Sequence, residues 1–305
     1  MNTKIHDLII IGAGPCGLTA AIYAVRNKLD TIVLTKDIGG QMAWSGVIEN
    51  YSGFASMTGP ELTDAFENHA KSLGSLVKME PIVSLEKDGE YFLVKTTKNT
   101  YMSIAVLIAS GKNPKKLQIP GEVEFTNKGV VYCATCDGPL YANKRVAIIG
   151  GGNSALDAAA QLVNIASHVY VINKNSSMKG DLTLFEKVSK CDNITFVYDA
   201  MTREIKGDKL VSSIVYERKG RVEEIFVDGV FVQIGLLPNS QFATVAEKNE
   251  YGEVLVDSEN KTNIPGLFAA GDVTQISEKQ VVIAAGEGSK ASLSAFKYIS
   301  RKRSS

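Results

Sequence analysis

The chain has 305 residues, a length typical of two domains, and its 45% hydrophobic and 22% charged residues are ordinary for a globular enzyme. Lysine plus arginine and aspartate plus glutamate number 33 each, so the net charge is zero, which argues against nucleic acid as a partner because phosphate binding needs a basic excess. No apolar run reaches membrane-spanning length and the N-terminus has no secretory-signal pattern, so we expect no membrane partner and a cytoplasmic protein.

The chain opens with a predicted strand, a glycine-rich turn, a helix and a second strand. Residues 7–11 (DLIII) are an apolar run, residues 18–25 have helical apolar spacing, and residues 31–34 (TIVL) form the next strand. The turn at residues 12–17, GAGPCG, fits G-x-G-x-x-G, in which the glycines let a pyrophosphate approach a helix N-terminus. Asp37 follows 20 residues later, where an acid often binds a ribose hydroxyl. The segment therefore predicts a dinucleotide site.

Antiparallel strands are predicted next. Apolar and polar residues alternate over residues 82–104, with a turn at Lys87-Asp88-Gly89. Residues 106–111 (VLIASG) then form an apolar strand closed by glycine.

Two of the four cysteines form a C-x-x-C pair, Cys133 and Cys136. In a reducing compartment such a pair is more often catalytic or metal-binding than a structural link. Zinc would need a second pair or two histidines at ligand spacing, and the three histidines are far apart, so we expect no metal. We expect Cys16 to pack within the glycine-rich turn and Cys191 to be an incidental thiol.

A second strand–turn–helix–strand unit follows Lys144. Residues 145–149 (RVAII) and 168–172 (HVYVI) are predicted strands, and residues 156–165 a helix. The loop GGGNSA between them has the form G-x-G-x-x-A, and the sequence favours a vestigial nucleotide loop, kept for the fold, over a working site. The residues that define this loop are Gly150, Gly152, Asn153 and Ala155.

The second unit repeats the order of the first. Strand-like sequence covers residues 194–231 with a turn at Lys206-Gly207-Asp208, and residues 230–235 (VFVQIG) again form an apolar strand closed by glycine. The chain therefore contains an internal repeat.

The tail is expected to complete the first domain. Residues 267–270 (LFAA) form a strand that ends at Gly271-Asp272, and residues 280–299 form a helix. Prolines occur in the candidate hinges, residues 111–120 and 237–242.

The predicted fold class is α/β, with two nucleotide-binding, Rossmann-like domains of three layers (ββα), the second inserted in the first. We expect the first domain to comprise residues 1–115 and 240–305, and the inserted domain to comprise residues 116–239 and to carry the cysteine pair.

Together these motifs resemble those of the low-molecular-weight thioredoxin reductases, over nearly the whole chain. The motifs are GAGPCG at 12–17, GGQ at 39–41, CATCDG at 133–138, GGGNSA at 150–155 and FAAGDV at 268–273. The related peroxiredoxin reductases have a similar core but carry an extra N-terminal region that this sequence lacks. The thioredoxin-reductase-like ferredoxin–NADP reductases lack the cysteine pair. The resemblance implies a thioredoxin-disulfide reductase.

The resemblance also implies FAD in the first domain. The residues implied for the pyrophosphate are Gly12, Gly14, Pro15 and Gly17, and those implied for the flavin are Gly40, Gln41, Asn50, Gln280 and Val281. Val83 would lie near the adenine. Gly271 and Asp272 would contact the ribityl chain or the pyrophosphate. Asp37 remains the candidate for the ribose.

In this family pattern each member of the pair has its own role. Cys136 faces the flavin, and Cys133 attacks the disulfide of thioredoxin. Asp137 follows the pair directly and is the candidate general acid, with a turn-forming role as the alternative. Because one cysteine must reach the flavin and the other a whole protein, the resemblance implies rotation of the inserted domain about the hinges.

The electron donor is where the sequence departs from the family pattern. NADPH-using members carry H-R-R-x-x-x-R after the second glycine loop, whereas residues 173–179 read NKNSSMK. Lysine is a poor substitute for the planar fork of arginine, so Lys174 and Lys179 predict weak NADPH binding. Three donors stay open: reduced ferredoxin, NADPH bound through these lysines, and NADH. The retained GGGNSA loop favours a nucleotide, but the lost arginines remove the strongest phosphate contacts, so we expect reduced ferredoxin as the donor.

The resemblance is strongest to the ferredoxin-dependent flavin thioredoxin reductases of clostridia. Lys112, Lys115 and Lys116 are candidates for meeting an acidic ferredoxin, with a solvated loop as the alternative. The family suggests a homodimer. A hypothesis of another class is a flavoprotein redox sensor without turnover, against which the intact Cys133, Cys136 and Asp137 argue.

Overall fold

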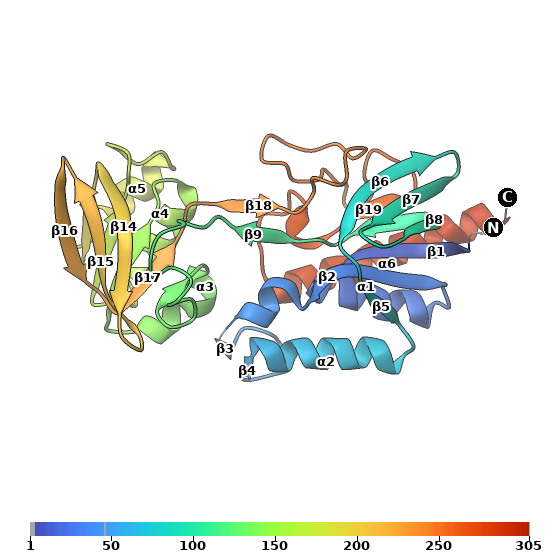
Figure 1. The fold of residues 1–305 in the computed structure, drawn as a ribbon, viewed down its shortest axis with the longest axis horizontal. Helices are drawn as coiled ribbons and strands as arrows, with labels where there is room; N and C mark the ends of the chain where they lie inside the picture. The colour runs from blue at the N-terminus through green and yellow to red at the C-terminus, as the bar shows by residue number, and fades with distance from the viewer. Residues whose placement is uncertain (1–3, 46, 305) are drawn as a thin grey trace. The chain divides into compact units, whose positions relative to one another are not determined.

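A computed structural model describes residues 4–45 and 47–304 and divides the chain into two compact units. Unit 1 comprises Met1–Asn113 with Leu237–Ser305, and unit 2 comprises Pro114–Leu236. The chain crosses between the units at β9 (Lys112–Pro114) and β18 (Leu236–Pro238), and these two short strands pair with each other (Figure 1). The crossings lie within two to three residues of the boundaries expected from the sequence.

Unit 1 is built on a mixed seven-stranded sheet in the order β5-β2-β1-β8-β7-β6, with β19 paired to β8 (Figure 1). Leu8, Ile9 and Ile10 in the centre of β1 are fully buried, because β1 lies between β2 and β8 and both of its faces are covered. The strands are β1 (Ile5–Ala13), β2 (Thr31–Ile38), β5 (Leu76–Met79), β6 (Ile82–Asp88), β7 (Tyr91–Thr96), β8 (Thr100–Ile108) and β19 (Leu267–Ala269), with a separate pair β3 (Val47–Ile48) and β4 (Met57–Thr58).

Helices α1 and α6 pack closely against each other in unit 1. Gly288 lies so near Cys16 that a side chain would meet its carbonyl oxygen at 2.1 Å, and the Ser292 hydroxyl donates to the carbonyl of Ala20. Cys16 is buried in this contact, as expected. The helices are α1 (Pro15–Arg26), η1 (Gly40–Trp44), α2 (Gly59–Ser72), η3 (Gly271–Val273) and α6 (Val281–Ser304).

Unit 2 has three layers. A parallel sheet in the order β10-β17-β11-β12-β13 is covered on one face by α4 and on the other by the antiparallel sheet β14-β15-β16. Val146 and Ile148 of β11 point toward α4, whereas Ala147 and Ile149 point toward β15. The strands are β10 (Val130–Val131), β11 (Arg145–Ile149), β12 (His168–Ile172), β13 (Ile194–Val197), β14 (Ala200–Gly207), β15 (Val211–Arg218), β16 (Arg221–Phe226) and β17 (Gly229–Val232). The helices are α3 (Ala134–Asp137), η2 (Gly138–Tyr141), α4 (Asn153–Leu162) and α5 (Leu182–Val188).

The predicted α/β class with Rossmann-like sheets is confirmed, and the two ends of one helix are corrected. Helix α4 begins at Asn153 and ends at Leu162, whereas the sequence predicted residues 156–165. Both ends lie three residues earlier because Gly152 caps the start and residues 163–166 form a turn. In unit 1 the hairpin β6–β7 continues the main sheet through β8.

Two basic residues near the end of α6 form ion pairs with acidic residues of unit 1. Arg303 pairs with the buried Asp7 of β1, and Lys302 pairs with Glu90 at 2.8 Å.

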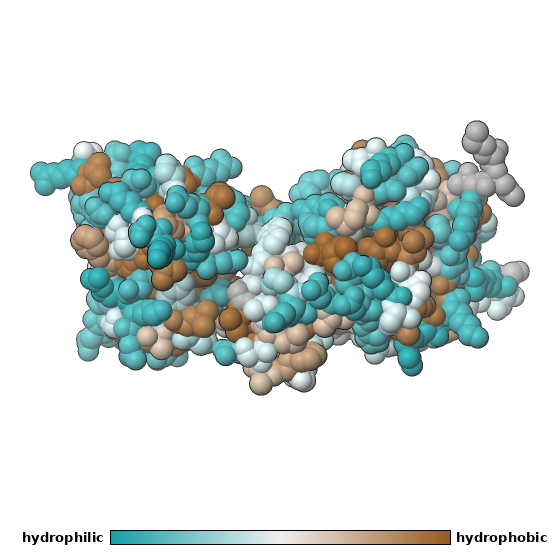
Figure 2. Space-filling view, turned by 60° about the horizontal axis from the view of Figure 1, so that its bottom comes forward, coloured by the Kyte–Doolittle hydropathy of each residue, from teal (hydrophilic) through white to brown (hydrophobic). Residues whose placement is uncertain are grey.

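Hydrophilic residues cover much of the surface that Figure 2 shows, with hydrophobic residues in separate patches. Among the helices in the described ranges, none is both long and apolar enough to cross a lipid bilayer.

Candidate active site

The cysteine pair lies in a short turn that follows β10. Cys133 caps the one-turn helix α3, and a disulfide joins it to Cys136, with the two Cα atoms 5.3 Å apart. The backbone N–H of Cys136 donates to Sγ of Cys133 at 3.1 Å. A donor aimed at this sulfur would stabilise a thiolate on Cys133 after reduction of the disulfide. Cys133 and Cys136 are both partly exposed.

The turn is anchored on the core of unit 2. Tyr141 of η2 is buried and its ring meets Phe231 of β17 edge-to-face, with the ring centroids 5.1 Å apart. The hydroxyl of Thr135 donates to the side-chain oxygen of Gln161 on α4 at 3.1 Å. These contacts hold the turn from both ends, so the sulfur atoms have a defined position.

Asp137 ends α3 and has an unusual acidity. Burial raises the pKa of its carboxyl to about 6. Burial also raises the pKa of Tyr141 to about 12, and the negative charge of Asp137 adds to this effect. A carboxyl whose pKa is raised toward neutral pH beside a disulfide is suited to transfer protons.

The first glycine loop of unit 1 needs glycine for steric reasons. Gly12 has φ +110° and a side chain there would meet the Ala109 carbonyl oxygen at 2.4 Å. A side chain on Gly17 would lie 1.8 Å from the Gly12 carbonyl oxygen. Gly14 caps α1 without a side-chain hydrogen bond, and Pro15 occupies the first turn. The start of α1 is therefore a backbone-lined site suited to an anion.

Two further segments converge next to this helix start, one after β2 and one after β19. A side chain on Gly40, which follows β2, would lie 3.9 Å from the Cα atom of Gly14. The side-chain amide of Gln41 lies 3.5 Å from the carboxylate of Asp272, which follows β19. Gly271 contacts Cys16, where a side chain would meet the Cβ atom at 3.1 Å. The carboxyl ends of neighbouring parallel strands thus gather most of the predicted cofactor residues at one edge of the sheet.

Asp272 is the carboxylate at this convergence. Burial raises its pKa, and the nearby ammonium groups of Lys279 and Lys112 oppose the rise. Asn50 and Gln280 lie together as well, with their side-chain amides hydrogen-bonded at 3.1 Å, and Val281 begins α6. A backbone-lined helix start beside a carboxylate and several amides fits the pyrophosphate and polyol of a flavin dinucleotide.

The side chains of two predicted cofactor residues make no hydrogen bond to this cluster within the described ranges. Asp37 lies near the end of β2, with its carboxylate 3.8 Å from the ammonium of Lys36. Val83 is 58% exposed on β6, where the pairing register shifts between Ile82 and Ser84, so its backbone has no ladder partner. Their roles stay predictions.

A buried ionic cluster in unit 1 went unpredicted. Lys112 is 7% exposed, and its ammonium contacts the carboxylate of Glu253, which also lies 3.7 Å from the ammonium of Lys279. Lys112 is therefore not the surface lysine considered for docking a ferredoxin, because β9 turns it inward. Lys115 and Lys116 are exposed, as a docking role would require.

The second glycine loop is engaged by the segment that follows β12. The Asn153 side-chain oxygen accepts the backbone N–H of Asp181 at 2.7 Å, and Gly151 lies directly against the side chain of Asn173. Gly150 has φ +156° and lies against the Gln233 carbonyl oxygen, and Gly152 faces open space. Ala155 is fully buried, and its side chain packs in the core of unit 2.

The segment expected to clamp a nucleotide phosphate forms its own internal contacts. The side chain of Asn173 donates to the Ser177 carbonyl at 2.8 Å and accepts the N–H of Asn175 at 3.0 Å. Lys174 and Lys179 are exposed and form no ion pair with any carboxylate of the described ranges.

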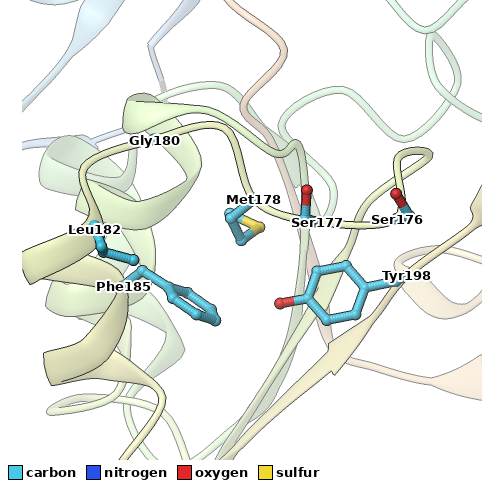
Figure 3. A pocket seen from close by; sticks show the side chains of 7 residues that line it. All are labelled: Ser176, Ser177, Met178, Gly180, Leu182, Phe185 and Tyr198. Carbon is cyan, nitrogen blue, oxygen red and sulfur yellow. The ribbon is translucent and has the colours of Figure 1, made fainter.

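Beside this segment lies a cavity of about 280 Å³ (Figure 3). Figure 3 shows the side chains of Met178, Phe185 and Tyr198 directed toward one another around it. All of its lining residues are uncharged: Ser176, Ser177, Met178, Gly180, Leu182, Phe185 and Tyr198. The cavity therefore has no group in its lining that would hold a phosphate by charge.

The chain matches the family described as pyridine nucleotide-disulphide oxidoreductase over residues 6–288. It therefore belongs to this family. Together with its similarity to solved thioredoxin reductases, this membership makes it an enzyme of the flavoprotein disulfide oxidoreductase class.

Solved structures and curated relatives give a finer comparison. The thioredoxin reductase of Streptococcus pyogenes MGAS5005 is 31% identical with a TM-score of 0.93, and the match covers 98% of this chain and 100% of that chain. A ferredoxin-flavin thioredoxin reductase from Clostridium acetobutylicum is 31% identical with a TM-score of 0.55 and complete coverage of both chains.

A component of the alkyl hydroperoxide reductase of Pseudomonas aeruginosa is 40% identical over 97% of this chain and 58% of that protein. The NADH dehydrogenase of Bacillus subtilis is 38% identical over 97% of this chain and 59% of that protein. The chain thus spans less than two thirds of the length of these curated relatives.

Proposed function

We propose that this protein is a thioredoxin-disulfide reductase that works through FAD and the Cys133–Cys136 pair. The observation that carries the proposal is the cysteine turn: a partly exposed disulfide, a backbone N–H of Cys136 that donates to the sulfur of Cys133, and Asp137 beside it, whose pKa burial raises to about 6. The similarity to solved thioredoxin reductases supports thioredoxin as the partner. A homodimer and a cytoplasmic location are further parts of the proposal, the latter because reduced thiols persist there.

FAD would be held by unit 1. The first glycine loop and the start of α1 would take the pyrophosphate, and Gln41 and Asp272 would bind the polar groups next to it. Asn50 and Gln280 would line the flavin, Val83 would lie near the adenine, and Asp37 would bind the ribose. When bound, FAD would supply a carrier that accepts electrons from the donor and passes two of them to the disulfide.

The protein residues then carry out thiol–disulfide exchange. The Cys133 thiolate attacks one sulfur of the thioredoxin disulfide, which forms a mixed disulfide and releases a thioredoxin thiolate. Cys136 attacks Cys133, which re-forms the internal disulfide and releases the second thiolate. Asp137, which titrates near pH 6, would donate a proton to a leaving thiolate and regain it from solvent.

Reduced ferredoxin is the donor that we propose. Residues 173–179 hold no arginine, Asn173 is committed to hydrogen bonds within its own loop, and the adjoining cavity has an uncharged lining. A solved structure similar to this chain bears the name of a ferredoxin-flavin thioredoxin reductase. Two ferredoxins would each deliver one electron, and two protons complete the reduction of one disulfide.

Nicotinamide nucleotides are the second candidate donor. A relative named NADH dehydrogenase favours NADH, and the exposed ammonium groups of Lys174 and Lys179 favour NADPH. A redox sensor without turnover remains the alternative of another class.

Rapid anaerobic mixing separates these candidates. The flavin-loaded protein is mixed with NADPH, with NADH and with a reduced bacterial ferredoxin, and the visible absorption band of the flavin is followed. We expect fast bleaching with ferredoxin alone. Fast bleaching by either nucleotide would overturn the ferredoxin proposal, and absence of turnover with thioredoxin after bleaching would favour the sensor.

A further inference from the structure

Tyr132, the residue directly before the redox-active pair, is tied to a buried carboxylate. Glu122 is 1% exposed and accepts the Tyr132 hydroxyl at 3.0 Å. The same carboxylate accepts the backbone N–H of Leu117 at 2.9 Å and of Gln118 at 2.8 Å. Three donors compensate the buried charge, so this network is expected to be rigid.

Two further contacts fix Tyr132 from other directions. Its carbonyl accepts the side-chain N–H of Gln233, whose backbone N–H donates to Ile149 at the end of β11. The ammonium of Lys116 lies 3.7 Å from the centre of the Tyr132 ring, a favourable cation–π contact. The residue is thus held by residues 116–118, where the chain enters unit 2, and by Gln233, near where it leaves.

We propose that Glu122 and Tyr132 are positioning residues for the redox-active cysteines, holding Cys133 where it meets Cys136 in the dithiol as well as in the disulfide. Reduction removes the covalent link, so the distance between the two sulfur atoms then depends on the anchoring of the turn. Fixing the residue before Cys133 lowers the entropy lost when the ring closes again. The anchor therefore raises the effective concentration of one thiol near the other and stabilises the disulfide.

The two variants Tyr132→Phe and Tyr216→Phe form a matched pair for the test. Tyr132→Phe keeps the ring and its cation–π contact but removes the hydroxyl that binds Glu122. Tyr216 of β15 is a buried tyrosine of the same unit, and its hydroxyl donates to the exposed Glu223 at 2.7 Å. Each variant loses one phenol–carboxylate hydrogen bond, and only the first loses it next to the cysteines.

The measurement is the redox equilibrium of the pair in the flavin-loaded protein of 305 residues. Samples are equilibrated with mixtures of reduced and oxidised dithiothreitol, quenched with an alkylating reagent, and the alkylation of Cys133 and Cys136 is read by mass spectrometry. For Tyr132→Phe we expect the equilibrium constant for the disulfide to fall about three- to tenfold, a rise of roughly 15–30 mV in midpoint potential. For Tyr216→Phe we expect the wild-type value within about twofold.

Equal midpoint potentials for the two variants would overturn the positioning role. A second variant adds a check: Glu122→Gln should shift the equilibrium in the same direction, and the double variant should shift it less than the sum of the single effects. The inference rests on the proposed redox role of the pair but needs neither electron donor nor thioredoxin. If the wild-type pair did not titrate at all, the proposed function itself would fail.

Discussion

Replacing Asp137 with asparagine tests the electrostatics of the redox-active turn. Burial raises the pKa of this carboxyl from the ordinary value of 3.8 to about 6. The unfolded chain exposes the carboxylate to water, so folding at pH 7 requires its charge to be moved into the turn. A difference of about two pH units corresponds to at most about 3 kcal/mol, because one unit is worth about 1.4 kcal/mol.

The sign of the effect follows from the raised pKa. The folded protein binds this proton more tightly than the unfolded chain does, so stability from the protonated carboxyl is complete below about pH 4 and is lost as the pH rises through about 6. Asparagine stays neutral at every pH. We expect Asp137→Asn to be more stable than the wild type by about 1–3 kcal/mol at pH 7 and equal to it at pH 4 and below.

Urea unfolding followed by circular dichroism at both pH values measures the difference. Asp181→Asn is the matched control, because Asp181 caps α5 through Leu184 and asparagine caps a helix about as well. The same Asp137→Asn variant should reduce thioredoxin about a hundredfold more slowly, since the proton donor is lost. An Asp137→Asn protein with unchanged stability at pH 7 and unchanged turnover would refute the reasoning.

Two further substitutions test unit 1. Lys112→Met removes one of the two ammonium groups beside the Glu253 carboxylate and leaves Lys279 at 3.7 Å. It should destabilise the protein by about 2–3 kcal/mol in thermal or urea unfolding. The exposed Lys115→Met should change stability by less than about 0.5 kcal/mol, and equal effects would contradict the buried pair. Gly17→Ala forces a side chain against the carbonyl oxygen of Gly12, 1.8 Å away, and should abolish retention of FAD during purification. Gly286→Ala adds a side chain in open space and should retain FAD fully. The ratio of flavin to protein absorbance measures the retained FAD.

The elements that sequence reasoning predicted best are those with a strong local signal. The apolar runs that form β1, β11 and β12 are buried on both faces, and the glycines between strand and helix are required by contacts with backbone oxygens, as at Gly17. The CATCDG motif marked the redox-active turn because cysteine spacing is a local property. Fold class and the position of the candidate site therefore followed from the sequence alone.

Side-chain networks between distant segments could not be predicted in this way. Lys112 has the sequence context of a hinge lysine, and its burial depends on Glu253, 141 residues further along the chain. Glu122 and Tyr132 are only 10 residues apart, yet no periodicity links them, since their contact depends on the loop between them. Local patterns report which residues face the core, whereas the pairing of buried polar groups is decided by tertiary packing.

The most direct test of the central claim, reduction of thioredoxin through Cys133 and Cys136, needs neither ferredoxin nor a nicotinamide nucleotide. The flavin-loaded protein is reduced photochemically by two electrons per molecule under anaerobic conditions, mixed with oxidised thioredoxin, and the thiols that appear on thioredoxin are counted. The wild type and Cys191→Ser, which changes a thiol outside the pair, should reduce about one thioredoxin disulfide per enzyme, and Cys133→Ser should reduce none. Reduction by Cys133→Ser at the wild-type level would contradict the account.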